Sequence, residues 1–243
     1  MNIFSAFAII IVAGLIHASF QLSISILTLL SSHTIGRKKS HMRLLALTHS
    51  FVFGASTMTI LLLCFFALLL QSAFASAIPS AVVWTIVCGA MVGLAFAVFL
   101  FYYRRQTGTV LWVPRGMARY LSTRAKTTKH SAEAFSLGLS SVAAEILFIG
   151  APITVAALIL IQLPPLLQLA GALTYGVVAT SSLAVIHILI SGGHSISRLQ
   201  KWREQNKHFL QFAAGGGLLV LGFYLYVDQV MTIAVMAAEK TVW

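Results

Sequence analysis

Acidic residues are scarce in this chain: five Asp and Glu occur among 243 residues, and charged residues of both signs make up only 9%. Hydrophobic residues make up 59%. Soluble globular domains contain roughly 25% charged and 45–50% apolar residues, so this composition excludes an ordinary soluble domain. We predict an integral membrane protein.

Cysteine is almost absent too, which excludes a disulfide scaffold. Cys64 and Cys88 stand in separate apolar segments, without a C-x-x-C pair or metal-ligand spacing. We expect both to be buried, inert thiols. No Ser, His and acid constellation and no phosphate-binding loop can be placed in the sequence. We therefore expect a protein that is not an enzyme and has no cofactor.

Six apolar runs are long enough to cross a bilayer, which takes about 20 residues for each helix. They lie near residues 3–31, 44–73, 79–103, 132–162, 165–192 and 208–232. The first run has small residues near Ala18, as a signal peptide does, but it lacks a basic start and continues to Leu30. We interpret it as a retained crossing. The predicted fold is an all-α bundle of six transmembrane helices.

Lysine and arginine gather in alternate connections and account for the net charge of +11. Because cytoplasmic loops collect these residues, residues 32–43, 104–130 and 193–207 are predicted to be cytoplasmic, with both termini outside. A bacterial inner membrane is the expected location. Trp112 and Trp202 among the basic residues favour contact with anionic lipid head groups. The placement of basic residues in alternate loops argues against nucleic-acid binding. It leaves open whether the chain binds a partner protein or forms a homo-oligomer.

Three pairs of segments are similar at nearly constant separations. GLIHASFQLS at 14–23 matches GLSSVAAEIL at 138–147, an offset of 124 residues; Gly54 pairs with Gly176 at 122, and Gly89 with Gly215 at 126. We predict a first three-helix repeat at 1–103, a basic interfacial linker at 104–130, and a second repeat with a short outer tail at 131–243. Three crossings is an odd number, so the second repeat enters the membrane in the opposite sense, as in many secondary transporters.

Glu145 is the one acidic residue deep inside an apolar segment. A carboxylate in hydrocarbon costs roughly 2.5–3.5 kcal/mol on insertion scales, so such groups usually face the bundle interior or a wet cavity. The predicted repeat aligns Gln21 with Glu145 and brings both to a similar depth. We therefore predict a substrate site around these two residues.

Neighbouring polar residues extend this predicted site. His17 lies one turn from Gln21, and Ser141 one turn from Glu145, so each pair shares a helix face. His49 is a further candidate, although a lone membrane histidine is more often an interhelical hydrogen-bond partner; His187 is a weaker one. Imidazole and carboxylate together suit a divalent transition metal, but no metal can be assigned.

Proline and glycine suggest where the helices bend and pack. Pro152, two turns beyond Glu145, predicts a kink in the fourth crossing. Gly89-x-x-x-Gly93 and the run Gly215 to Gly217 predict close approach of helix backbones.

Four motifs carry a resemblance to a known family: Gly14-Leu15, Arg43 followed by Ser50 to Gly54, Phe135 to Leu139, and Gly216 to Gly222. Their order resembles the six-crossing transmembrane domain of the cytochrome c biogenesis and disulfide-reductase thiol transporters, and more broadly the lysine-exporter superfamily. The resemblance implies a six-helix fold with a site at the membrane midplane.

The chain departs from this family at the site itself. The thiol transporters have a proline-cysteine pair in the middle of the first and fourth crossings, where this chain has Phe20-Gln21 and Ala144-Glu145. Their electron relay should therefore be absent. The proline-glycine-proline motif of the amino-acid exporters is missing as well, which leaves the substrate class open.

Three functions remain open at this point. The first is a secondary transporter that moves a small cationic or proton-coupled solute by alternating access. The second is a redox protein in which His17, His49 or His187 binds haem between helices. The third is a non-catalytic membrane subunit that docks a partner or lipid, in which Glu145 is a structural hydrogen-bond partner of Gln21.

Overall fold

The computed structural model describes residues 2–20, 22–35, 41–74, 79–102, 115–192, 198, 201–202, 205–233 and 235, and these are almost entirely helical, without a strand. The α-helices are α1 (Ile3–Ser19), α2 (Leu22–Ile35), α3 (His41–Ala73), α4 (Ala81–Ala97), α5 (Arg115–Thr127), α6 (Ser131–Ala144), α7 (Ile146–Leu160), α8 (Pro165–Ala179), α9 (Ser181–Ser191) and α11 (Lys207–Leu225). Two π-helices, η1 (Val98–Tyr102) and η2 (Tyr226–Met231), continue α4 and α11.

Apolar helices of membrane-spanning length coincide with the six predicted runs. Three are single helices over 42–73, 81–101 and 208–231, and three are bent pairs: α1 with α2 at 48°, α6 with α7 at 80°, and α8 with α9 at 48°. The described residues therefore form three candidate spans, or up to six if each bent pair is one span. Large apolar side chains cover its outside; Leu68, Val177 and Val220 are 66%, 71% and 70% exposed. Such a surface fits lipid and indicates a membrane protein.

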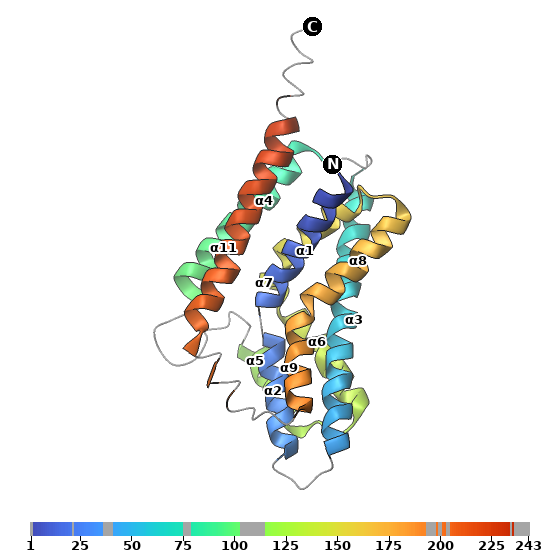
Figure 1. Cartoon of the computed structure of the whole chain (residues 1–243), viewed down its shortest axis with the longest axis vertical. Coiled ribbons are helices and arrows are strands. Elements are labelled where there is room, and N and C mark those ends of the chain that lie inside the picture. Colours follow the sequence, from blue (N-terminus) through green and yellow to red (C-terminus); the bar gives the residue numbers. More distant parts are fainter. Residues whose placement is uncertain are drawn as a thin grey trace.

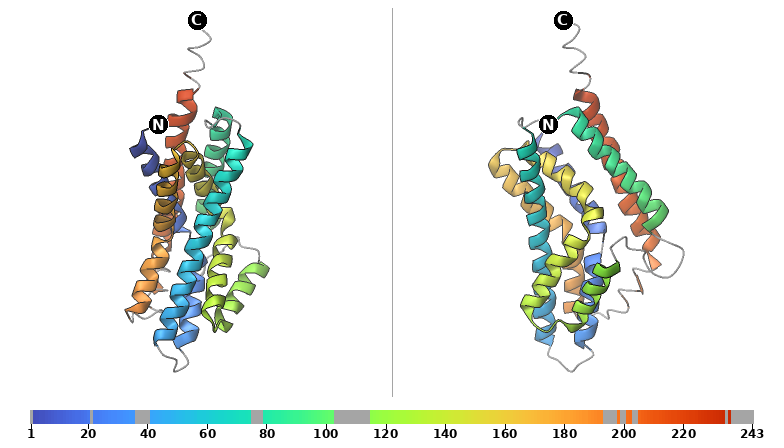
Figure 2. Two further views of the ribbon diagram at one scale, coloured as in Figure 1. Left: turned by 90° about the vertical axis from the view of Figure 1, so that its right-hand side faces the viewer. Right: turned by 180° about the vertical axis from the view of Figure 1, so that it is seen from behind.

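The helices run alternately along one long axis (Figure 1). Helix α1 begins and η2 ends at the same end of the molecule, whereas α2 ends and α3 begins at the opposite end. Helices α4 and α11 pack against each other at one side of the bundle (Figures 1 and 2). The short helix α5 packs against α2 and α6 near the end where α3 begins.

The closest helix crossing joins α3 and α6 through two glycines. A Cβ atom on Gly138 would collide with the backbone carbonyl of Phe51, and one on Gly54 would collide with the carbonyl of Phe135. The contact is reciprocal, because each glycine lies three residues after the phenylalanine on which the other helix packs. Small residues of this kind let membrane helices approach closely, so this pair fixes α6 against the unbroken helix α3.

The glycine pattern predicted by sequence is wrong at three positions, Gly89, Gly93 and Gly216, where a Cβ atom would meet nothing within 4 Å. A Cβ atom on Gly215, by contrast, would meet the ring of Phe99. Gln211 of α11 instead ties α11 to η1, because its side-chain amide donates to the carbonyls of Val98 at 3.1 Å and Phe99 at 2.9 Å. A π-helix shifts the backbone hydrogen-bond register. The Gln211 amide donates to the carbonyls of Val98 and Phe99, where that shift begins.

The structure bears on two further expectations, the kink at Pro152 and the burial of the cysteines. Pro152 lies inside α7 without ending it, and the fourth apolar segment bends at Glu145. Glu145 has φ −86° and ψ −1°, and its backbone N–H donates to the Val142 carbonyl three residues earlier, so the α-helical pattern stops there. Cys88 is buried as expected, but Cys64 is exposed on the apolar outside.

Candidate functional site

The three helix breaks meet around one small cavity in the middle of the bundle. Phe20 follows α1, Glu145 separates α6 from α7, and Thr180 separates α8 from α9. The complete lining is His17, Phe20, Ser23, Ile24, Thr59, Val142, Glu145, Ala179, Thr180, Ser182 and Leu183. The cavity volume is about 10 Å³, which is room for about one water molecule. In this conformation the site is closed.

Glu145 is 3% exposed and lies against the start of the half-helix α2. Its Oε1 accepts hydrogen bonds from the backbone N–H of Ser23 at 2.5 Å and from the Ser23 hydroxyl at 2.8 Å. The first N–H groups of a helix have no partner within the helix, and a helix N-terminus stabilises nearby negative charge. The carboxylate therefore caps α2 from the second half of the chain.

The other two breaks are linked in a similar way. The Ser182 hydroxyl in the first turn of α9 donates to the Ala18 carbonyl near the end of α1, at 3.1 Å. The Ser56 hydroxyl of the unbroken helix α3 donates to the Thr180 hydroxyl oxygen at 3.3 Å, and Thr180 donates to the Gly176 carbonyl. Backbone groups that a break exposes must find partners, because lipid offers none. Two such partners come from other breaks: Glu145 accepts from the Ser23 N–H, and Ser182 donates to the Ala18 carbonyl.

His17 joins the same cavity from α1. It is 4% exposed, and its Nδ1 lies 2.9 Å from the Tyr175 hydroxyl of α8, which is fully buried. The structure thus brings together His17 and Glu145, which the sequence analysis selected. It adds Ser23 and Tyr175, which that analysis missed. The sequence did contain signals for some of the missed residues. Ser23 belongs to the repeated motif GLIHASFQLS, and Thr180 and Ser182 belong to a hydroxyl-rich run within an apolar segment.

Two of the remaining predicted residues, Ser141 and His49, do not line the cavity. Ser141 is buried, but its hydroxyl donates to the Gly138 carbonyl at 2.8 Å and it does not line the cavity. His49 is on the outside of α3, with its ring 5.8 Å from that of His187 on α9. This ring contact joins two helices, and the hydrogen bond beside it joins His187 Nδ1 to the Thr48 hydroxyl at 3.0 Å. A hydrogen-bonding role for His49 stays a prediction. Gln21 lies outside the described residues.

The chemistry of the site is that of a buried carboxylate among hydroxyls and one imidazole. Among the residues that the structure describes, no group of three or more His, Cys, Asp and Glu could hold a metal ion. Comparison of the chain with protein-family models, curated proteins and solved structures finds no match. Fold and site together define a helical membrane protein whose broken helices converge on a buried carboxylate.

Proposed function

We propose that this protein is a secondary transporter that moves a small cationic or proton-coupled solute by alternating access. The convergence of three helix breaks on Glu145 carries the proposal. Discontinuous helices at the bilayer midplane form the substrate sites of many transporters. A helix that only anchors a protein has no need of a break, because each break exposes backbone polar groups in lipid.

An inverted repeat is part of the proposal, and the positions of the breaks support it. The break after Phe20 and the break at Glu145 coincide when the two halves are aligned at the offset of 124 residues. Both third helices, α4 and α11, continue into a π-helix. Helices α1 and α6 run in opposite directions (Figure 1). The symmetry is incomplete, because α3 is continuous where its counterpart breaks at Thr180.

The proposed topology places both termini outside the cytoplasm of a bacterium. Arg43 is in the first turn of α3, and its side chain donates to the carbonyl of Lys129, just after α5, at 2.9 Å. Helix α5, which contains Arg124, lies near the end of the bundle where α3 begins (Figure 2). The connection between α7 and α8 at the other end has no charged residue. Since basic residues gather on the cytoplasmic side, we assign the end of the bundle that contains α5 to the cytoplasm.

Competition for Glu145 gives the proposed mechanism. The cavity is too small for an organic solute, so loading requires the half-helices to separate. A cation that binds the carboxylate competes with the N–H and hydroxyl of Ser23, and thus loosens the start of α2. Unloaded and loaded states then differ in whether Glu145 caps α2.

A structural role for Glu145 is the second candidate, and its hydrogen bonds to Ser23 favour that role directly. The variant Glu145→Gln separates the two functions. Glutamine keeps a side-chain oxygen that can accept from Ser23 but cannot carry charge or a proton. A structural cap should survive this change, whereas cation binding should not.

The test uses vesicles containing the purified protein and a pH-sensitive dye. Monovalent cations, divalent cations and organic amines are added outside in turn, with an imposed pH gradient. We expect the parent protein to respond to at least one class and Glu145→Gln to give no response. Glu133→Gln is the matched control, because it makes the same change at the exposed start of α6, where glutamine also fits a capping box. Full transport by Glu145→Gln at equal protein levels refutes the proposed role.

A further inference from the structure

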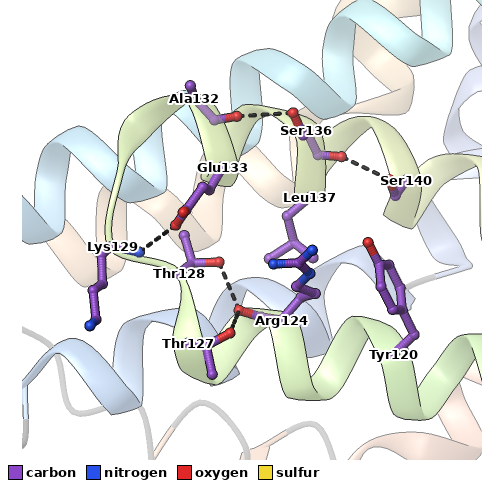
Figure 3. A pocket seen from close by; sticks show the side chains of 10 residues that line it. All are labelled: Tyr120, Arg124, Thr127, Thr128, Lys129, Ala132, Glu133, Ser136, Leu137 and Ser140. Carbon is purple, nitrogen blue, oxygen red and sulfur yellow. Dashed lines mark hydrogen bonds between the residues drawn. The ribbon is translucent and has the colours of Figure 1, made fainter.

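A second and much larger pocket lies between α5 and α6, away from the helix breaks. Its volume is about 530 Å³, and its lining is Tyr120, Arg124, Thr127, Thr128, Lys129, Ala132, Glu133, Ser136, Leu137 and Ser140. Figure 3 shows Arg124 and Tyr120 rising from α5 toward the Ser136 and Ser140 face of α6. Six of these side chains end in oxygen atoms and two carry positive charge, so the lining is suited to a polar ligand.

The two cations of the pocket have no ion-pair partner within the described part of the chain. The Arg124 guanidinium lies 5.6 Å from the centre of the Tyr120 ring, a cation–π contact that leaves its N–H groups available. Glu133 is the one carboxylate in the lining. Its Oε2 already accepts from the backbone N–H groups of Lys129 at 2.8 Å and His130 at 3.3 Å. The pocket therefore carries a net positive charge that a ligand can neutralise.

The hydroxyl groups of the pocket act as acceptors. Their hydrogens are directed at backbone carbonyls: Ser136 to Ala132, Ser140 to Ser136, Thr127 to Thr123 and Arg124, and Thr128 to Arg124. A hydroxyl whose hydrogen is used still presents lone pairs. The donors are thus Arg124, Lys129 and Tyr120, and the acceptors are four hydroxyl oxygens and Glu133.

This pattern selects a ligand that combines negative charge with hydroxyl groups. A phosphate diester is recognised by arginine, and attached hydroxyls can donate to the serine and threonine oxygens. A bare phosphate would place its oxygens against those same acceptors. We propose that the pocket binds a phosphate diester with free hydroxyl groups, supplied by the glycerophosphate head group of an anionic phospholipid.

The position of α5 indicates the lipid source. Leu121 and Ala125 bury one side of α5 against the bundle, while Arg119, Arg124 and Lys126 are on its exposed side. A basic amphipathic helix of this kind lies at the membrane surface, where anionic head groups are concentrated. The inference uses the proposed topology but is independent of transport through the Glu145 site.

Native mass spectrometry of the detergent-solubilised protein tests the proposal. The parent protein is titrated with phosphatidylglycerol, with phosphatidic acid, which has no head-group hydroxyl, and with zwitterionic phosphatidylethanolamine. We expect one phosphatidylglycerol to bind at least about tenfold more tightly than either of the others. Arg124→Gln should weaken that binding about tenfold, and Ser136→Ala with Ser140→Ala should reduce the preference over phosphatidic acid. Lys126→Gln should leave both unchanged, because Lys126 carries the same charge on α5 but does not line the pocket.

Three results would overturn the proposal. Equal weakening by Arg124→Gln and Lys126→Gln would show general attraction to a basic helix. Equal binding of phosphatidic acid and phosphatidylglycerol would remove the assigned role of the hydroxyl acceptors. Equally tight binding of soluble glycerophosphoglycerol in lipid-free detergent would reject the membrane source. All these variants are at exposed or half-buried positions, so the protein should fold, and circular dichroism checks this.

Discussion

Substituting Gly138 by alanine should destabilise the protein by about 2 kcal/mol. In a helix interior alanine is favoured over glycine by roughly 1 kcal/mol, so the change is favourable unless the new methyl group meets an obstacle. At Gly138 the obstacles are the Phe51 carbonyl and the Ala55 nitrogen, both backbone atoms of α3. Backbone cannot rotate away as a side chain does, so α3 and α6 must separate. Overpacking of this kind costs about 1–3 kcal/mol, and we expect the upper end.

Gly150→Ala is the matched control in the other half of the same bent pair. A Cβ atom there meets nothing within 4 Å, so this change should raise the free energy of unfolding by up to about 1 kcal/mol. The two variants should thus differ by about 3 kcal/mol in equilibrium unfolding by SDS in mixed micelles, followed by circular dichroism. Adding Gly54→Ala to Gly138→Ala should cost less than the sum, because the helices are already apart. Equal unfolding free energies for Gly138→Ala and Gly150→Ala would refute the reasoning.

Two further predictions concern topology and the α2 cap. The topology is tested in a variant without native cysteines. Thr123→Cys on α5 should react with an impermeant thiol reagent only after cells are opened, whereas Ser80→Cys before α4 should react in intact cells. The reverse labelling pattern would invert the topology. Ser23→Ala should lower the free energy of unfolding by roughly 1.5–3 kcal/mol, as for a hydrogen bond to a charged group, while exposed Ser32→Ala has little effect. In the Glu145→Gln background the loss should fall to roughly 0.5–1.5 kcal/mol; an unchanged loss would show that Ser23 does not act through the carboxylate.

The apolar segments and the buried acid could be predicted from sequence because both follow from transfer free energies. About 20 apolar residues suffice to mark a crossing, and the six predicted runs coincide with the apolar helices and bent pairs of the structure. The cost of a carboxylate in hydrocarbon selected Glu145, and the structure buries it at a small cavity lined by both polar and apolar side chains. Neither inference required knowledge of which helices are neighbours.

The helix break and the tight glycine crossing could not be predicted in this way, because both depend on contacts between distant segments. Pro152 is a local signal for a kink, yet the bend lies at Glu145, whose carboxylate binds Ser23 in a different half of the chain. Gly89 and Gly93 have the familiar small-residue spacing, but no neighbour approaches them. Gly54 and Gly138 make the closest crossing, and only their common position three residues after a phenylalanine relates them in sequence.

The links among the three breaks give a physical reason why they should move together. A hydrogen bond from Ser23 to an ionised Glu145 would contribute roughly 1.5–3 kcal/mol, and the neutral bond from Ser182 to the Ala18 carbonyl contributes roughly 0.5–1.5 kcal/mol. A further neutral bond of the same size joins Thr180 at the third break to Ser56 of the unbroken helix α3. Together they hold the closed state by a few kcal/mol. Moving a two-state equilibrium from 1:99 to 99:1 needs about 5.5 kcal/mol of differential binding. A cation that replaces Ser23 at the carboxylate removes the largest link while adding its own interaction with the opened state. Under the proposed alternating-access mechanism, we expect the solute's own contacts with the opened state to supply this differential binding.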